Sequence, residues 1–135
     1  MPSFVLKEMG QSNQFDLEFA SQMFKALGDE TRLRVLNLIV KYGEMCISDL
    51  ELVLDFTQTK TSRHLIYLKH SGLLSTRKKG QWTFYYLKPK TKEPVTNFLQ
   101  NVSFDLQLLK DIETYNILFT NRELAAFKMT QRRYF

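Results

Sequence analysis

The stretch TQTKTSRHLIYLKHSGLL, residues 57–74, decides the fold that this sequence predicts. It holds two lysines, one arginine and two histidines, and it contains no acidic residue. Thr57 or Thr59 is suited to cap the start of a helix, because a threonine hydroxyl accepts a hydrogen bond from a free amide of the first turn. Gly72 is suited to end that helix. We therefore expect a short basic helix, which favours a negatively charged partner.

The two sides of this helix differ in chemistry. At about 100° per residue, one side carries a core face, made of Thr61, Leu65, Leu68 and Gly72. The opposite side carries hydroxyl, cationic and aliphatic groups, namely Thr59, Arg63, Ile66 and His70. Donors for base acceptors, beside an aliphatic contact for a thymine methyl group, are typical of a helix that reads the major groove of DNA. A solvated surface helix is the alternative interpretation.

A second short helix is predicted just before the basic one. Ser48 is suited to cap the segment DLELVLD, residues 49–55, and Phe56 closes that segment. Two short helices separated by about three residues are typical of a helix-turn-helix.

After the basic helix, the sequence predicts a β-hairpin. Residues 74–78 and 81–87 are rich in β-branched and aromatic side chains, Lys79-Gly80 supplies the turn, and Pro89 stops the second strand. Helix, turn, helix and hairpin in this order predict a winged helix-turn-helix. The fold class is therefore mainly α (α+β), with a two-stranded wing.

Helical periodicity also precedes this unit. We expect one helix over residues 15–27, and a second that Asp29 caps and Gly43 ends. The second helix is apolar on most sides, so it belongs in the core. Residues 44–47 are expected to form a short extended connector.

The periodicity resumes after the hairpin and predicts one long helix over residues 91–119. At 1.5 Å per residue such a helix is on the order of 40 Å long, more than a small domain covers, so part of its apolar stripe is expected to meet another chain. Asn121 is suited to cap a last short helix over residues 122–129. We thus divide the chain into an N-terminal arm (1–14), a winged helix DNA-binding domain (15–90) and a C-terminal helical dimerisation segment (91–135).

Charge is distributed unevenly along the 135 residues. Residues 56–92 hold nine lysines or arginines and no acid, whereas the rest of the chain holds 10 bases and 14 acids. Such a basic segment favours double-stranded DNA as the partner. One cysteine excludes an intrachain disulfide. No apolar run reaches the roughly 20 residues of a membrane span, and no signal peptide is evident, so we expect a cytoplasmic protein.

The helix-turn-helix geometry assigns expected DNA contacts. The N-terminal part of the second helix meets bases, which points to Gln58, Thr59, Ser62 and Arg63. Phosphate contacts are expected from Thr57, Lys60, Tyr67 and Lys69. The wing offers Arg77, Lys78, Lys79 and Gln81 to phosphates or to the minor groove. Trp82 could anchor the hairpin, but core packing is the role that we expect. His64 lies nearer the core direction and is expected to be partly buried.

Three segments stand in unbroken order, namely FKALGDETRLRVLNLI (24–39), TQTKTSRHLIYLKHSGLL (57–74) and RKKGQWTFYYL (77–87). In turn they resemble the opening signature, the recognition helix and the wing of the ArsR/SmtB family of bacterial metalloregulatory repressors. The resemblance covers residues 15–87 in unbroken order. It implies a homodimer whose outer helices pair, a palindromic operator, and DNA contacts from Gln58, Ser62, Arg63 and His64.

The sensor segments depart from the family. Arsenic-sensing members carry two cysteines in ELCVCDL, whereas residues 44–50 read EMCISDL, with Cys46 at the first position and Ser48 at the second. Zinc-sensing members use Asp and His on the last long helix, but residues 91–119 contain no histidine. A thiophilic ion needs two or three thiolates. We therefore predict no metal site and no cofactor, and the effector stays open.

Cys46 has two interpretations, a small buried core residue or a redox-sensitive thiol of a redox-responsive regulator. An enzyme with Cys46 as nucleophile and His64 or His70 as base is a third hypothesis, but nothing in the sequence places these side chains together. We therefore expect no enzyme. A winged helix that binds proteins instead of DNA is a further alternative, because one fold hosts several functions.

Overall fold

The computed structural model describes residues 15–120. The predicted arm over 1–14 and the predicted helix over 122–129 lie outside these residues. In chain order the elements are α2 (Leu17–Leu27), α3 (Glu30–Tyr42), β1 (Met45–Cys46), α4 (Ile47–Leu54), α5 (Gln58–His70), β2 (Leu74–Lys79), β3 (Trp82–Leu87), α6 (Pro89–Gln100) and α7 (Leu106–Thr120). Within residues 15–120, no helix has the length and apolar character needed to cross a membrane.

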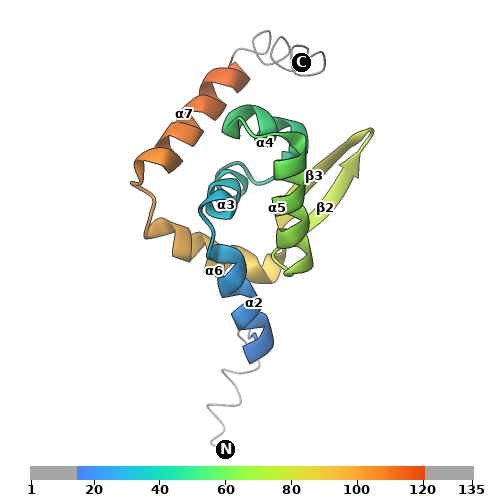
Figure 1. The fold of residues 1–135 in the computed structure, drawn as a ribbon, viewed down its shortest axis with the longest axis vertical. Helices are drawn as coiled ribbons and strands as arrows, with labels where there is room; N and C mark the ends of the chain where they lie inside the picture. Colours follow the sequence, from blue (N-terminus) through green and yellow to red (C-terminus); the bar gives the residue numbers. More distant parts are fainter. Residues whose placement is uncertain (1–14, 121–135) are drawn as a thin grey trace, which may run out of the picture.

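Helix α3 lies in the middle of the molecule and contacts α2, α5, α6, α7 and the sheet (Figure 1). The Asp29 side chain caps it, accepting a hydrogen bond of 3.0 Å from the Arg32 amide, and Gly43 ends it at a φ of 86°. Its buried residues are Val35, Leu36, Leu38 and Ile39. The prediction of a core helix with these two ends is confirmed.

The sheet of the described residues has three antiparallel strands in the order β1-β3-β2. The hairpin, here called the wing, runs in register from Leu74↔Leu87 to Lys79↔Trp82, as predicted. The connector contributes a third strand, because Met45 pairs with Tyr85. The expectation for Trp82 is wrong. This side chain is 37% exposed because it lies at the tip of the wing, beyond the reach of the core.

Helices α4 and α5 pack against each other and form the predicted helix-turn-helix. Helix α5 begins after Thr57, whose hydroxyl oxygen accepts a hydrogen bond of 3.1 Å from the Lys60 amide. The predicted cap of α4 is wrong by two residues. Helix α4 begins after Cys46, without a side-chain cap, because the chain turns directly from β1 into the helix and draws Ser48 into the first turn.

The prediction of one helix over 91–119 is wrong, because the chain forms α6 and α7 with a turn between them (Figure 1). The Asp105 side chain accepts hydrogen bonds from the amides of Gln107 (2.9 Å) and Leu108 (3.2 Å) and so starts a new helix. Leu106, an apolar residue at helical spacing within the predicted helix, is 83% exposed. The apolar residues kept helical spacing across the turn, so the spacing did not reveal that Asp105 caps a new helix.

Candidate nucleic-acid interface

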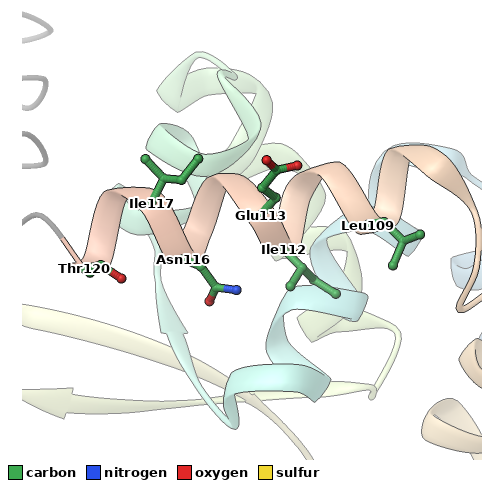
Figure 2. Close-up of a pocket in the computed structure, with 6 residues that line it drawn as sticks. All are labelled: Leu109, Ile112, Glu113, Asn116, Ile117 and Thr120. Carbon is green, nitrogen blue, oxygen red and sulfur yellow. The ribbon is translucent and has the colours of Figure 1, made fainter.

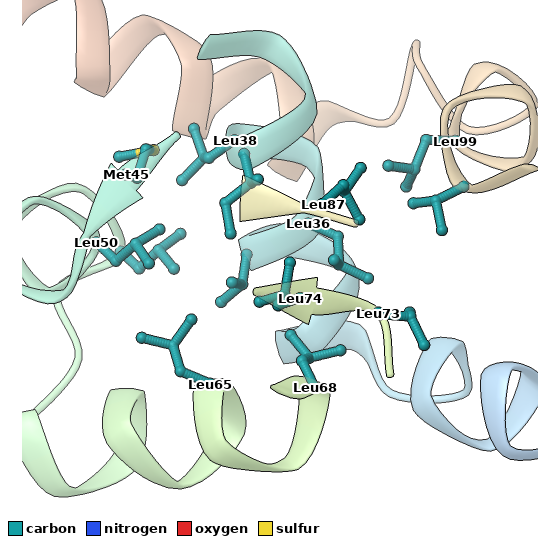
Figure 3. Packing of buried hydrophobic residues seen from close by; sticks show 14 of the residues in the cluster. Leu36, Leu38, Met45, Leu50, Leu65, Leu68, Leu73, Leu74, Leu87 and Leu99 are labelled. Atoms are coloured by element: carbon teal, nitrogen blue, oxygen red, sulfur yellow. The ribbon is translucent and has the colours of Figure 1, made fainter. Parts of the chain in front are cut away.

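Helix α5 is oriented as its sequence predicted. Thr61, Leu65 and Leu68 are fully buried, and Figure 3 shows Leu65 and Leu68 pointing from α5 toward the strand that carries Leu74. The opposite side is therefore turned to solvent, and its residues are exposed, namely Thr59, Arg63, Ile66 and His70. Ile66 is 47% exposed, which leaves an aliphatic surface among polar groups.

The start of α5 is fixed by the backbone and by one residue. Besides capping the helix, Thr57 offers its carbonyl oxygen to the hydroxyl of Thr61, at 2.8 Å. Gln58 and Thr59 are exposed in the first turn, and Ser62 is half-buried one turn later. The residues predicted to meet bases are thus brought to one end of the helix.

Two of the predicted phosphate-binding residues already have partners within the fold. The Lys60 ammonium group lies 3.9 Å from the centre of the Phe56 ring. The Arg32 guanidinium lies 4.1 Å from the centre of the Tyr67 ring, and Arg32 also donates to the carbonyl of Ala26 at 2.7 Å. These cation–π contacts fix the directions of both side chains on the flanks of α5.

His64 faces the interior and is only 8% exposed. Burial lowers the pKa of its imidazole, and the carboxylate of Asp29 opposes this effect, while Arg63, Arg32 and Lys60 add to it. The side chain is thus favoured in its neutral form. The expectation from helical spacing, that His64 is partly buried, agrees with this placement. The base contact implied by the family resemblance gains no support from it.

Two cations of the wing have an acidic partner, Glu44, that the sequence pattern did not predict. Arg77 donates to both carboxylate oxygens of Glu44, and the Lys79 ammonium lies 3.4 Å from the same carboxylate. We call Glu44, Arg77 and Lys79 the wing ion cluster. Lys78 and Gln81 are exposed. No local pattern pairs Glu44 with residues more than thirty positions away; only the strand order brings them together.

Several cations of α5 and the wing have no carboxylate partner within the described part of the chain. Among residues 15–120, no acidic side chain forms an ion pair with Lys60, Arg63, Lys69 or Lys78. Three of these residues lie on α5 and one on the wing. The arrangement can neutralise phosphates along a polyanion while it presents hydrogen-bond donors to base edges.

Cys46, the possible sensor residue, is buried. Cys46 is 6% exposed, and its thiol donates a weak hydrogen bond to the Ser48 hydroxyl at 3.8 Å. Burial raises the pKa of the thiol, which opposes the thiolate form that oxidants and metals require. This agrees with the interpretation of Cys46 as a core residue.

Two acidic residues at the last helix, Asp105 and Asp111, have structural partners. Asp105 caps α7, and Asp111 is paired with Arg34 at 2.9 Å. Over residues 15–120, no three side chains of the types His, Cys, Asp or Glu gather in a group that could hold a metal ion. That the protein has no metal site stays a prediction.

The profile described as "Bacterial regulatory protein, arsR family" matches residues 29–76. The chain is 52% identical over 68 residues to the arsenical resistance operon repressor of Escherichia coli, covering 50% of this chain and 58% of that protein. It is 44% identical over 78 residues to an arsenic resistance transcriptional regulator of Pseudomonas putida, covering 58% of this chain and 68% of that protein. The chain thus spans less than two thirds of the Escherichia coli repressor.

Solved structures share the fold. A homodimeric winged helix-turn-helix DNA-binding domain from Mycobacterium bovis superposes with a TM-score of 0.58 at 25% identity, over 67% of this chain and 87% of that one.

Proposed function

Because this chain belongs to the arsR family of bacterial regulatory proteins, we propose that it is a sequence-specific DNA-binding transcriptional regulator that acts as a homodimeric repressor. The family consists of regulatory proteins and not of enzymes. The observation that carries the proposal is the outer face of α5, where Arg63 and Lys69 are exposed and no carboxylate of residues 15–120 pairs with them.

We propose that the first turns of α5 enter the major groove. Gln58, Thr59, Ser62 and Arg63 are the base-reading residues in this proposal, and an arginine donates two hydrogen bonds to a guanine. Thr57, Lys60, Tyr67 and Lys69 then hold phosphates and set the register. The wing lies on the backbone of the neighbouring turn.

The exposed apolar residues support the proposed homodimer. On α7, Leu106, Leu109 and Ile117 are 83%, 43% and 54% exposed. Leu109 and Ile117 also line a shallow apolar depression with Ile112, and Figure 2 shows them along the helix. On α2, Leu17 and Phe24 are 88% and 63% exposed. Pairing of such faces between two copies would set two α5 helices against the half-sites of a palindromic operator.

The test measures binding of the full chain to its own promoter DNA by fluorescence anisotropy, against a shuffled duplex of equal length, over a series of salt concentrations. We expect the promoter to bind at least roughly 10³-fold more tightly, and the affinity for both duplexes to fall as salt rises. Equal affinity for both duplexes, or affinity independent of salt, would contradict the proposal. Sedimentation of the free protein tests the dimer.

Nothing in residues 15–120 favours the other functions that the sequence left open. A redox-responsive regulator needs an accessible thiolate, and Cys46 is buried with a raised pKa. A protein-binding module does not account for the cations of α5 that no carboxylate of residues 15–120 neutralises.

A further inference from the structure

The three consecutive cations of the wing stand in two different environments. Arg77 and Lys79 share the carboxylate of Glu44, whereas Lys78, between them, forms no ion pair within residues 15–120. Arg77 and Lys79 are 50% and 57% exposed, and Glu44 is 27% exposed. The acid is therefore the better-anchored member of the cluster, beside strand β1.

Strand alternation places these cations on opposite faces of the sheet. The pairs Leu74↔Leu87, Thr76↔Tyr85 and Lys78↔Thr83 share one face, because successive side chains of a strand point to opposite sides. Leu74 and Leu87 are buried in the core, and Tyr85 packs against it. Lys78 thus lies on the face that packs on the helices, and Arg77 and Lys79 lie on the other face.

Helix α5 packs on the same face of the sheet as Lys78. Helix α5 contacts β2, and its buried leucines point toward Leu74 (Figure 3). Beyond the core, the wing extends past α5 as a free hairpin (Figure 1). A duplex lying against the outer side of α5 would therefore approach the wing from the side on which Lys78 stands.

We infer that Glu44 is a positioning residue that holds Arg77 and Lys79 on the far face of the wing, so that Lys78 is the wing cation that contacts phosphate. This inference rests on the proposed function and deepens it.

Three interactions hold the wing ion cluster together. One guanidinium nitrogen of Arg77 donates charge-assisted hydrogen bonds to both oxygens of Glu44, and the Lys79 ammonium lies beside the same carboxylate. The Arg77 hydrogen bond also lowers the pKa of Glu44, so the acid stays ionised at neutral pH. The Lys79 ammonium lies 5.4 Å from the centre of the Phe84 ring, which further restrains it on that face.

The salt dependence of DNA binding counts the cations that displace counterions. Each phosphate neutralised on a duplex adds about 0.9 to the slope of log affinity against log salt. Lys78→Ala is therefore expected to reduce the slope by about 0.9 for promoter and shuffled DNA alike. Arg77→Ala and Lys79→Ala are expected to leave the slope unchanged.

The decisive variant is Glu44→Gln, which releases the long side chains of Arg77 and Lys79, so that they can reach around the edge strand β2 to phosphate. We expect it to steepen the slope by up to about 2. Glu93→Gln is the matched control, because Glu93 is an exposed acid on α6 and its removal changes the net charge equally. That control is expected to leave the slope unchanged. Circular dichroism of each variant checks that the fold is intact.

The inference is overturned if Arg77→Ala or Lys79→Ala reduces the slope as Lys78→Ala does, or if Glu44→Gln behaves like Glu93→Gln. These outcomes differ from failure of the proposed function. In that case the unmodified protein itself binds the promoter no more tightly than the shuffled duplex, whereas the inference is judged from the salt slopes of the variants on either duplex.

Discussion

Two arginines of this chain, Arg63 on α5 and Arg34 on α3, use the same charged group in opposite ways. Arg63 is exposed, and no carboxylate within residues 15–120 pairs with it. Arg34 donates from two nitrogens to the two oxygens of Asp111 on α7, each at 2.9 Å, and Asp111 is only 2% exposed. An unpaired surface charge leaves its hydrogen-bond donors available to a partner, whereas a paired and buried charge holds two helices together.

The region around Asp111 is built as a network. Gln107 donates a third hydrogen bond to Asp111, at 3.0 Å, and Tyr42 on α3 donates to Asn116 on α7 at 3.0 Å. The Tyr42 ring also stacks on Tyr115, with 3.6 Å between the ring centres. Helix α7 is thus fixed to α3 by polar and aromatic contacts, while Leu109 and Ile117 stay exposed on its outer side.

The largest effect is expected from Asp111→Ala. The change leaves the Arg34 guanidinium, which is 22% exposed, without its carboxylate, and an uncompensated charge in such a site costs about 3 kcal/mol of the free energy of unfolding. Urea denaturation measures the loss. Glu93→Ala, which removes an exposed acid, serves as the control and is expected to change stability by less than about 0.5 kcal/mol. Equal effects of the two variants would refute the comparison.

Next in size is the effect of Arg63→Ala on DNA binding. Loss of a bidentate base contact is expected to weaken binding to the promoter duplex by roughly 1–3 kcal/mol and to relax discrimination against shuffled DNA. Urea denaturation of the same variant should show unchanged stability, because Arg63 forms no ion pair within the described residues. A stability loss comparable to that of Asp111→Ala would show that Arg63 stabilises the folded protein, which contradicts this prediction.

Two glycines test the ends of the DNA-reading elements. Gly72 follows α5 at a φ of 84°, and a Cβ atom there would lie 2.7 Å from the Phe19 ring. Gly72→Ala is therefore expected to destabilise the fold by more than the roughly 1–2 kcal/mol that a left-handed backbone alone costs. Gly80 lies at the wing tip with a φ of 60° and open space around it. Gly80→Ala should therefore reduce stability only by the cost of the left-handed backbone. Thermal or urea unfolding ranks the two, and the reverse order would contradict the packing at Gly72.

The smallest expected effect is a dependence of stability on pH through His64. Burial lowers its pKa in the folded state below the usual 6.5, so the unfolded chain binds a proton more readily. The stabilising contribution is complete above pH 6.5 and is lost as pH falls through the lowered value. His64→Gln should flatten this part of the profile of unfolding free energy against pH. A profile equally steep in the variant would assign the dependence to other groups.

Local rules predicted most of the DNA-reading unit. The caps at Asp29 and Thr57, the turn at Gly80 and the buried face of α5 depend on residues a few positions apart, and all were found as expected. The same kind of rule failed over residues 91–119, where spacing of apolar residues outweighed the capping signal of Asp105. Periodicity shows which residues share a face of a helix, but it does not show whether the helix is continuous.

By itself, the sequence determined the order of the elements as far as the wing, the basic segment and the outward face of α5, because backbone propensity and side-chain spacing act over a few residues. Only the tertiary structure decided that Arg34 finds Asp111 and that Glu44 holds Arg77 and Lys79. These partners are 77, 33 and 35 positions apart, and ion pairs depend on distance in space. Which charges of a basic segment remain free for DNA is therefore a property of the packed fold.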